Sequence, residues 1–140
     1  MDKKNCKRLL IIDDEENMRH MLSMLLKKTG YVADTAQNGE QGLEIIRHNH
    51  YDFILCDMKM PQIDGMEFLK LGKDNLESTT VIMMSAYGTI DSAIEAMKLG
   101  AYDYISKPFK TDEVYLALKK AEERETLRRE NFRLKERIRE

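Results

Sequence analysis

The chain has 140 residues, 42% of them hydrophobic, which suits one ordinary domain with a buried core. It contains no run of about 18 apolar residues, and its amino terminus lacks a secretory hydrophobic region. The formal net charge is −2, but from Lys119 onward nine Lys or Arg face six Asp or Glu, so the preceding body is acidic. We therefore expect a cytoplasmic protein with no membrane contact and no direct nucleic-acid binding.

Short apolar runs alternate with segments of helical periodicity along the chain. The runs of strand length are residues 8–12, 31–35, 53–56, 81–84 and 102–105. Five segments have helical periodicity. The first extends from the acidic pair to Gly30, the second opens at Gly39, the third and fourth span residues 64–71 and 89–100, and the fifth begins after an N-cap at Thr111. This alternation predicts an α/β fold: a flavodoxin-like, doubly wound, five-stranded parallel sheet of order 2-1-3-4-5, with helices on both faces and an extended C-terminal helix.

Polar residues lie where the predicted strands end. Asp13 and Asp14 follow the first strand, and Asp57, Ser85 and Lys107 follow the third, fourth and fifth. Each alone has an ordinary structural explanation, such as a helix N-cap or a turn. The carboxyl ends of parallel strands meet at one edge, however, so these side chains are expected in one crevice.

Three carboxylates in one crevice repel one another unless they share a proton or a cation. Oxygen ligands favour a hard metal, and Mg²⁺ fits best, with Mn²⁺ as a substitute. A metal on one side and the Lys107 ammonium on the other would neutralise a phosphoryl group attacked by Asp57. In this arrangement Asp13 and Asp14 are metal ligands, and the Ser85 hydroxyl donates to a phosphoryl oxygen.

The motifs resemble the response-regulator receiver domain of two-component signalling over residues 8–121. The resemblance rests on four segments: Leu-Leu-Ile-Ile-Asp-Asp-Glu-Glu from residue 9, Asp-Met-Lys-Met-Pro-Gln-Ile-Asp-Gly from residue 57, Ser85-Ala86, and Tyr-Ile-Ser-Lys-Pro-Phe from residue 104. It implies a phosphoprotein whose Asp57 takes a phosphoryl group from a sensor histidine kinase. Such a chain is not an enzyme in the usual sense, but assists its own phosphorylation and dephosphorylation.

The resemblance also assigns finer roles. Asp14 would bind the metal directly and Asp13 mainly through water, with the backbone carbonyl of Lys59 completing the site, and the Lys107–Pro108 peptide bond would be cis. Ser85 and Tyr104 would form a switch pair that remodels the face made by the fourth helix, fifth strand and fifth helix.

Two positions are candidates for setting the lifetime of the phosphorylated state. Lys59 lies two residues after the proposed nucleophile, and Tyr87 lies two residues after the switch serine. We hypothesise that these bulky side chains hinder the hydrolytic water and slow dephosphorylation.

The sequence after residue 121 predicts a charged helix beyond the receiver, at residues 122–140. Leu127, Asn131, Leu134 and Ile138 step by four, three and four residues, as expected for a parallel dimeric coiled coil with Leu at d and Asn and Ile at a. Glu123 and Glu130 would then face Arg128 and Lys135 of a second copy. Only about two heptads are apolar, so a lone solvated helix remains the alternative to a homodimer.

Ser85-Ala86-Tyr87-Gly88, residues 96–104 and the helical linker resemble the NtrC class of transcriptional activators. In that class an ATPase domain and a DNA-binding domain follow the linker, and this chain contains neither a phosphate loop nor a helix-turn-helix after it. We expect a regulatory fragment of a longer protein, with a stand-alone regulator as the alternative.

Three other functions compete with the switch. A constitutive dimerisation module, independent of phosphorylation, would keep the tail and tolerate loss of Asp57. A metal-dependent phosphatase needs a second acid two residues after its nucleophile, where this chain has Lys59. Dinucleotide binding is the weakest candidate, because no Gly-x-Gly-x-x-Gly follows the first strand.

Overall fold

The computed structural model describes the backbone of residues 7–86 and 88–139, and side chains in this range as far as residue 137. Five strands form one parallel sheet of order β2-β1-β3-β4-β5, as the sequence predicts. They are β1 (Arg8–Ile12), β2 (Val32–Ala36), β3 (Phe53–Asp57), β4 (Thr80–Ser85) and β5 (Asp103–Ser106). The chain forms two compact units, which divide between Phe109 and Lys110.

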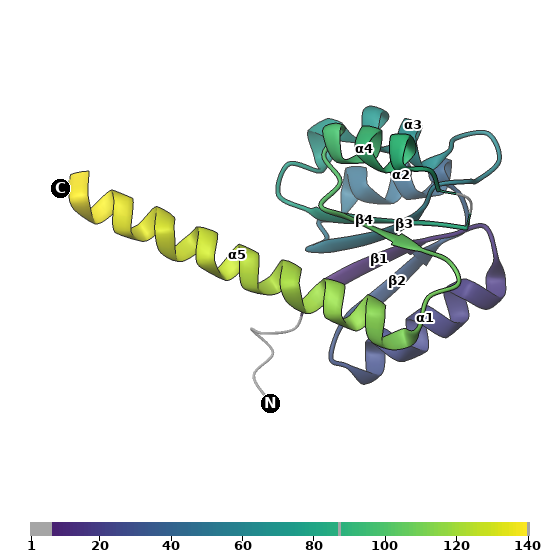
Figure 1. Cartoon of the computed structure of the whole chain (residues 1–140), viewed down its shortest axis with the longest axis horizontal. Coiled ribbons are helices and arrows are strands. Elements are labelled where there is room, and N and C mark those ends of the chain that lie inside the picture. The colour runs from purple at the N-terminus through teal and green to yellow at the C-terminus, as the bar shows by residue number, and fades with distance from the viewer. Residues whose placement is uncertain (1–6, 87, 140) are drawn as a thin grey trace. The chain divides into compact units, whose positions relative to one another are not determined.

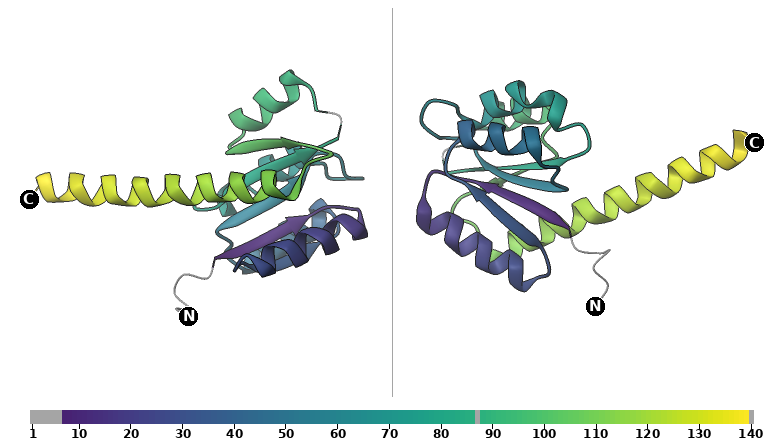
Figure 2. Two further views of the ribbon diagram at one scale, coloured as in Figure 1. Left: turned by 60° about the horizontal axis from the view of Figure 1, so that its bottom comes forward. Right: turned by 180° about the vertical axis from the view of Figure 1, so that it is seen from behind.

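The strands near the middle of the sheet are apolar on both sides because helices cover both faces. Every residue of β3 is buried, whereas the edge strand β2 alternates between exposed and buried positions. Figure 1 shows α1 (Glu16–Lys28) on one face, with α2 (Gly39–His48), α3 (Gly65–Leu71) and α4 (Ile90–Lys98) on the other. Figure 2 shows the same arrangement from two further directions. A short 3-10 helix, Lys73–Asn75, follows α3.

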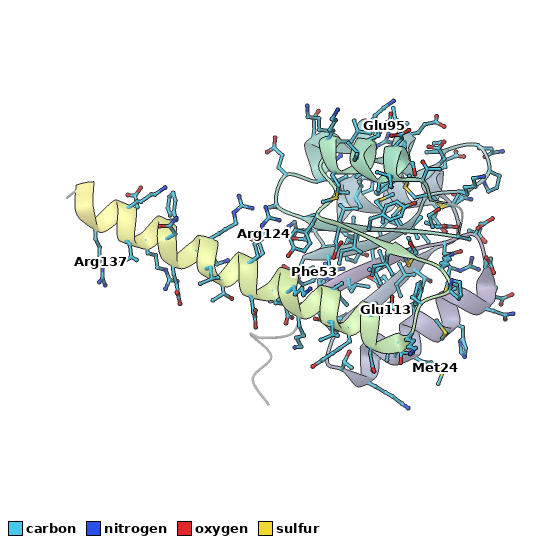
Figure 3. All side chains as sticks on the ribbon, viewed as in Figure 1. Met24, Phe53, Glu95, Glu113, Arg124 and Arg137 are labelled. Carbon is cyan, nitrogen blue, oxygen red and sulfur yellow. The ribbon has the colours of Figure 1, made fainter. Side chains whose placement is uncertain are left out.

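The main core lies on the side of the sheet covered by α2, α3 and α4. Leu10 and Ile12 of β1 and Ile54 of β3 are fully buried there, with Phe68 of α3. On the other side, Leu22 and other apolar residues of α1 are buried. In Figure 3, the labelled Phe53 lies within the sheet and Glu95 on the outer surface of α4. Packing on both faces fixes the strands and therefore the position of their carboxyl ends.

Local signals set the helix ends. Helix α1 closes as a Schellman motif: Gly30 has φ +100°, its N–H donates to the Lys27 carbonyl, and the Tyr31 N–H donates to the Leu26 carbonyl. Gly100, with φ +112°, closes α4 in the same way. The helical segment expected as far as Gly30 thus ends at Lys28, with Thr29 as the C-cap and Gly30 directly after it.

The second unit contains α5, Thr111–Arg139. The helix begins at Thr111 itself, one residue earlier than expected, because the Lys110 N–H is already paired with the Glu113 carboxylate at 3.4 Å. Residues 126–137 are all exposed, including Leu127, Phe132 and Leu134. The extended C-terminal helix is therefore present, and its apolar residues in this segment remain uncovered.

Candidate functional site

Strand register brings Asp13 and Asp57 to one edge of the sheet. Ile12 of β1 pairs with Cys56 of β3, so the two aspartates follow at neighbouring positions. The backbone N–H of Asp13 donates to the Ala36 carbonyl at 3.2 Å, which fixes the chain just after β1. Asp13 is fully buried and Asp57 is 6% exposed, whereas Asp14 is exposed.

Register also brings Ser85 and Lys107 to this edge. Ser85 pairs with Ser106 of β5, and the N–H of Lys107 donates to the Ser85 carbonyl at 2.7 Å. Ser85 is 3% exposed. The Lys107–Pro108 peptide bond is cis, as the family resemblance implies.

Asp13, Asp14 and Asp57 form a group able to hold a metal ion. One carboxylate oxygen from each lies within 4.8 Å of the others. Oxygen-only donors at this spacing suit Mg²⁺, which binds a few carboxylates and keeps several waters. The residues present therefore fit the hard cation expected from the sequence.

The three carboxylates differ in how their oxygens are already engaged. Asp13 Oδ1 accepts the Glu15 N–H at 2.9 Å, and Asp13 Oδ2 accepts from Lys107 Nζ at 2.9 Å. Arg19 of α1 donates to the backbone carbonyl of Asp13 at 2.8 Å. Both carboxylate oxygens of Asp13 thus have partners before a metal arrives, unlike an exposed carboxylate that can turn toward an ion.

Lys107 lies between two of the acids. Its Nζ is 2.9 Å from Asp13 Oδ2 and 3.5 Å from Asp57 Oδ1, and its side chain is 9% exposed. Burial alone would lower the pKa of Lys107, but the hydrogen bond and negative charge of Asp13, with a smaller contribution from Asp57, raise it. The ammonium is therefore held charged beside Asp57.

The surroundings of Asp57, in contrast, disfavour its charged form. Burial first, and the negative charge of Asp13 second, raise the pKa of Asp57 from 3.8 to about 6, although the charge of Lys107 opposes the shift. An ionised carboxylate here is under electrostatic strain, which a bound cation or the loss of its own charge would relieve.

The loop after Asp57 packs closely beneath the site. A Cβ on Gly65 would lie 2.8 Å from the Asp57 carbonyl oxygen and 2.9 Å from Met58 Cα, so only glycine fits without movement. Gln62 has φ +68°, in the left-handed region that L residues other than Asn and Asp seldom occupy. Lys59 is exposed two residues after Asp57.

Tyr104 lies two residues before the end of β5, and its ring turns toward the protein interior. The ring is partly buried and packs against the main core. Its hydroxyl oxygen is buried without a hydrogen-bond partner among the described residues. Tyr87, the other aromatic residue singled out from the sequence, lies outside the described residues.

Sequence reasoning missed three supports of this site. Arg19 gives only a weak signal, as a cation inside the apolar periodicity of α1. Gly65 belongs to a recognised motif, but its close approach to Asp57 depends on the loop conformation. The strained backbone at Gln62 carries no sequence signal, because glutamine rarely marks a left-handed residue.

A parallel 2-1-3-4-5 sheet with an acidic group, a lysine and a serine at its carboxyl edge defines the receiver class. The sequence profile of the response regulator receiver domain matches residues 9–119. The chain belongs to this family. Receiver domains are phosphoacceptors in signalling and bind Mg²⁺ at an acidic pocket, and this chain carries the acidic group of Asp13, Asp14 and Asp57.

The relatives agree with an NtrC-like receiver. Regulatory protein AtoC of Escherichia coli (strain K12) is 38% identical over 88% of this chain and 27% of its own length. Sporulation initiation phosphotransferase F of Bacillus subtilis (strain 168) is 42% identical over 81% of this chain and 91% of its own length. A response regulator receiver domain protein from Clostridium thermocellum has a TM-score of 0.80 and 34% identity, covering 86% of this chain and 98% of that structure.

The chain spans about a quarter of the length of AtoC and of the NtrX-like regulators that it matches. In the part of the chain that the structure describes, no helix is long and apolar enough to cross a membrane.

Proposed function

We propose that Asp57 accepts a phosphoryl group from a sensor histidine kinase in the presence of Mg²⁺, and that the phosphorylated state controls a downstream, transcriptional output. The observation that carries this proposal is Lys107 Nζ, held 2.9 Å from Asp13 and 3.5 Å from Asp57 within the acidic group. A buried ammonium beside a strained carboxylate suits a site that must receive further negative charge.

The engagement of each carboxylate suggests how the cation would be held. Asp14 is exposed, and the contact of Asp57 with Lys107 is the longer one, at 3.5 Å, so both can offer an oxygen directly. Asp13 already accepts two hydrogen bonds, which favours contact through water. The Lys59 carbonyl is the fourth ligand that the family resemblance implies. When bound, the cation would neutralise the phosphoryl oxygens.

The transfer itself requires little of the chain beyond positioning. A carboxylate oxygen of Asp57 forms a bond to phosphorus while the phosphorus–nitrogen bond of the donor phosphohistidine breaks, and the released imidazole keeps the electron pair and takes up a proton. Lys107 stays within reach of the transferred group because Asp13 anchors its ammonium at 2.9 Å. The Ser85 hydroxyl would donate to one phosphoryl oxygen. Water then attacks phosphorus and the bond to the Asp57 oxygen breaks, which returns Asp57 to the carboxylate and releases inorganic phosphate.

We propose that Ser85 and Tyr104 report the event to α4 and β5, and through the chain to α5. The new charge at Asp57 draws the Ser85 hydroxyl, and the ring of Tyr104 adjusts in turn. A local charge change that biases a two-state element is sufficient for such a switch.

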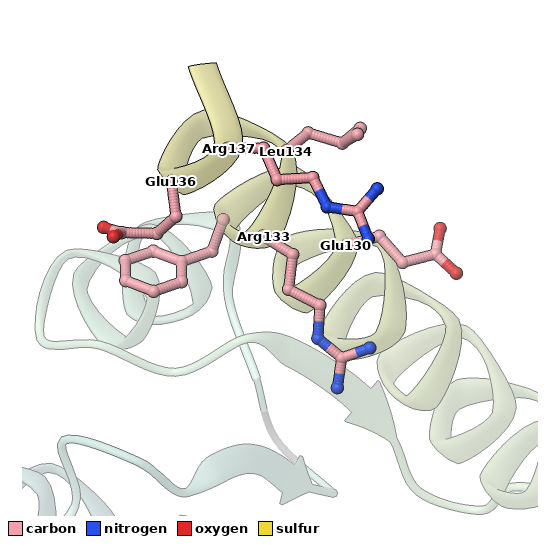
Figure 4. Close-up of a pocket in the computed structure, with 6 residues that line it drawn as sticks. Glu130, Arg133, Leu134, Glu136 and Arg137 are labelled. Atoms are coloured by element: carbon pink, nitrogen blue, oxygen red, sulfur yellow. The ribbon is translucent and has the colours of Figure 1, made fainter. Parts of the chain in front are cut away.

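The proposed receiver runs to residue 121, and residues 122–140 form a linker that pairs with a second copy as a parallel coiled coil. Leu127 is 64% and Leu134 58% exposed, which leaves the proposed seam open. Leu134 lines the pocket shown in Figure 4, together with Glu130, Phe132, Arg133, Glu136 and Arg137. The side chain of Ile138, the last seam position, lies outside the described residues.

In the cell we place the protein in the cytoplasm, as the regulatory part of a longer NtrC-like activator with ATPase and DNA-binding domains. The similarity to sporulation initiation phosphotransferase F, which this chain covers over 91% of its length, keeps a stand-alone regulator as the second candidate. Constitutive dimerisation without phosphorylation is the rival mechanism.

One experiment separates these mechanisms. The protein is treated with acetyl phosphate and Mg²⁺, and intact mass and light-scattering mass are compared with those of Asp57→Asn. A switch predicts a gain of one phosphoryl group and an altered association equilibrium in the wild type only. Identical association of both proteins, with or without treatment, would favour the constitutive dimer.

A further inference from the structure

The ring of Tyr104 carries a buried hydroxyl. Among the described residues it is the one buried side-chain polar atom without a hydrogen-bond partner. Burying an unpaired hydroxyl is unfavourable, because it gives up hydrogen bonds to water. The inward position of this ring must therefore be held by packing against the core rather than by its polar end.

Gly88, in the connection between β4 and α4, lies directly against this hydroxyl. A Cβ built on Gly88 would lie 2.5 Å from Tyr104 Cζ and 2.7 Å from Tyr104 Cε1, and closer still to the hydroxyl oxygen. Neither carbon contact is possible for a real side chain. Any residue other than glycine at position 88 is incompatible with the observed ring position.

A positive φ is given for Gly30 and Gly100 among the described glycines, whereas Gly88 is marked by its contact with Tyr104. Gly88 is also exposed, and the nearest atoms to a Cβ at this position belong to Tyr104. What the glycine provides is room for the Tyr104 ring.

We propose that Gly88 is the positioning residue that allows Tyr104 to lie inward, and that a side chain at position 88 holds the ring out. Gly88 lies three residues after Ser85 in the same connection. A displacement of this connection toward a phosphoryl group therefore changes the room available to the Tyr104 hydroxyl. This link to switching rests on the proposed function, whereas the steric exclusion does not.

The test uses the full chain and five proteins: wild type, Gly88→Ala, Tyr104→Ala, the double variant of these two, and Tyr104→Phe for assignment. Ring signals of Tyr104 are followed by NMR on ¹³C-tyrosine-labelled protein and assigned by their loss in Tyr104→Phe. A soluble paramagnetic agent then reports how exposed the ring is. We expect at least threefold stronger broadening of these signals in Gly88→Ala than in wild type, without any phosphodonor. Equal broadening would overturn the proposal.

Urea unfolding of the same proteins separates steric exclusion from general damage to the connection. Alanine at position 88 should raise the unfolding equilibrium constant less in the Tyr104→Ala background, where no ring opposes it. If Gly88→Ala fails to fold, folding of the double variant supports the proposal. Failure of both, or equal losses in both backgrounds, overturns it.

Acetyl phosphate and Mg²⁺ then test the link to switching. We expect the broadening of Tyr104 to change on phosphorylation of the wild type but not of Gly88→Ala. If the wild type gains a phosphoryl group while its ring signals stay unchanged, the link is wrong and the proposed function survives. If the wild type gains no phosphoryl group, the proposed function and this link both fail, and the steric result remains.

Discussion

Replacing Asp57 with asparagine should make the metal-free protein more stable at pH 7. Folding raises the pKa of Asp57 from 3.8 to about 6, mainly through burial and the charge of Asp13. A shift of about two units corresponds to about 3 kcal/mol of unfavourable interaction for the ionised form. Asparagine has nearly the shape of the neutral acid, so Asp57→Asn should recover about 2–3 kcal/mol of unfolding free energy.

The direction of the pKa shift determines how the stability of the wild type depends on pH. Because the pKa of Asp57 is higher in the folded than in the unfolded state, ionisation lowers stability as pH rises from about 3.8 to about 6. The gain in unfolding free energy of Asp57→Asn over wild type should therefore be complete above pH 6 and decrease toward pH 4. It should also shrink when Mg²⁺ is added, because the cation binds the folded wild type preferentially.

Urea unfolding at several pH values, with EDTA or with Mg²⁺, measures these differences. Asp74→Asn serves as the control: this carboxylate is exposed in the 3-10 helix, and its removal should change stability by less than about 0.5 kcal/mol. Two results would refute the electrostatic reasoning. One is an Asp57→Asn protein that is less stable than wild type at pH 7, and the other is a gain in stability over wild type that is as large at pH 4 as at pH 7.

Four further predictions follow from the same structure. Lys107→Met removes the cation paired with Asp13 in a nearly closed site, so it should cost about 3–5 kcal/mol of stability in urea at pH 7 and abolish labelling by acetyl phosphate; unchanged stability would contradict the ion-pair geometry. Gln62→Gly should stabilise by about 0.5–1 kcal/mol by relieving φ +68°, whereas Gln37→Gly, with no left-handed backbone to relieve, should destabilise. Replacing Lys59 and Tyr87 together with alanine should speed loss of the phosphoryl group, followed by mass spectrometry after removal of the donor, and an unchanged rate would end that hypothesis. Leu127→Ser with Leu134→Ser should weaken self-association by at least tenfold in analytical ultracentrifugation, whereas Phe132→Ser, equally exposed but off the seam, should not; equal effects would argue against the coiled-coil register.

Much of the arrangement at the sheet edge could be predicted from sequence because it depends on strand order. Asp13, Asp57, Ser85 and Lys107 each end or follow a strand, and parallel pairing places those ends together. Strand limits were less certain. The edge strand β2 begins at Val32 rather than at Tyr31, because the Tyr31 N–H closes helix α1 and not the sheet ladder.

Features that depend on loop conformation could not be predicted. The contact between Gly88 and Tyr104 requires the path of the β4–α4 connection, and the left-handed backbone at Gln62 requires the turn after β3. Arg19 acts through the carbonyl of Asp13, a contact that residue type and spacing do not reveal. Local patterns predict elements, whereas these contacts arise from how the connections fold over the sheet edge.

The proposed switch requires that Asp57 itself receives the phosphoryl group. Borohydride reduces an aspartyl phosphate to homoserine, so the modified residue can be identified by peptide mass spectrometry after treatment with acetyl phosphate and Mg²⁺. We expect homoserine at position 57 in the wild type, none in Asp57→Asn, and none when EDTA removes the metal. Homoserine at Asp13 or Asp14 instead, or no reducible acyl phosphate in the wild type, would contradict it.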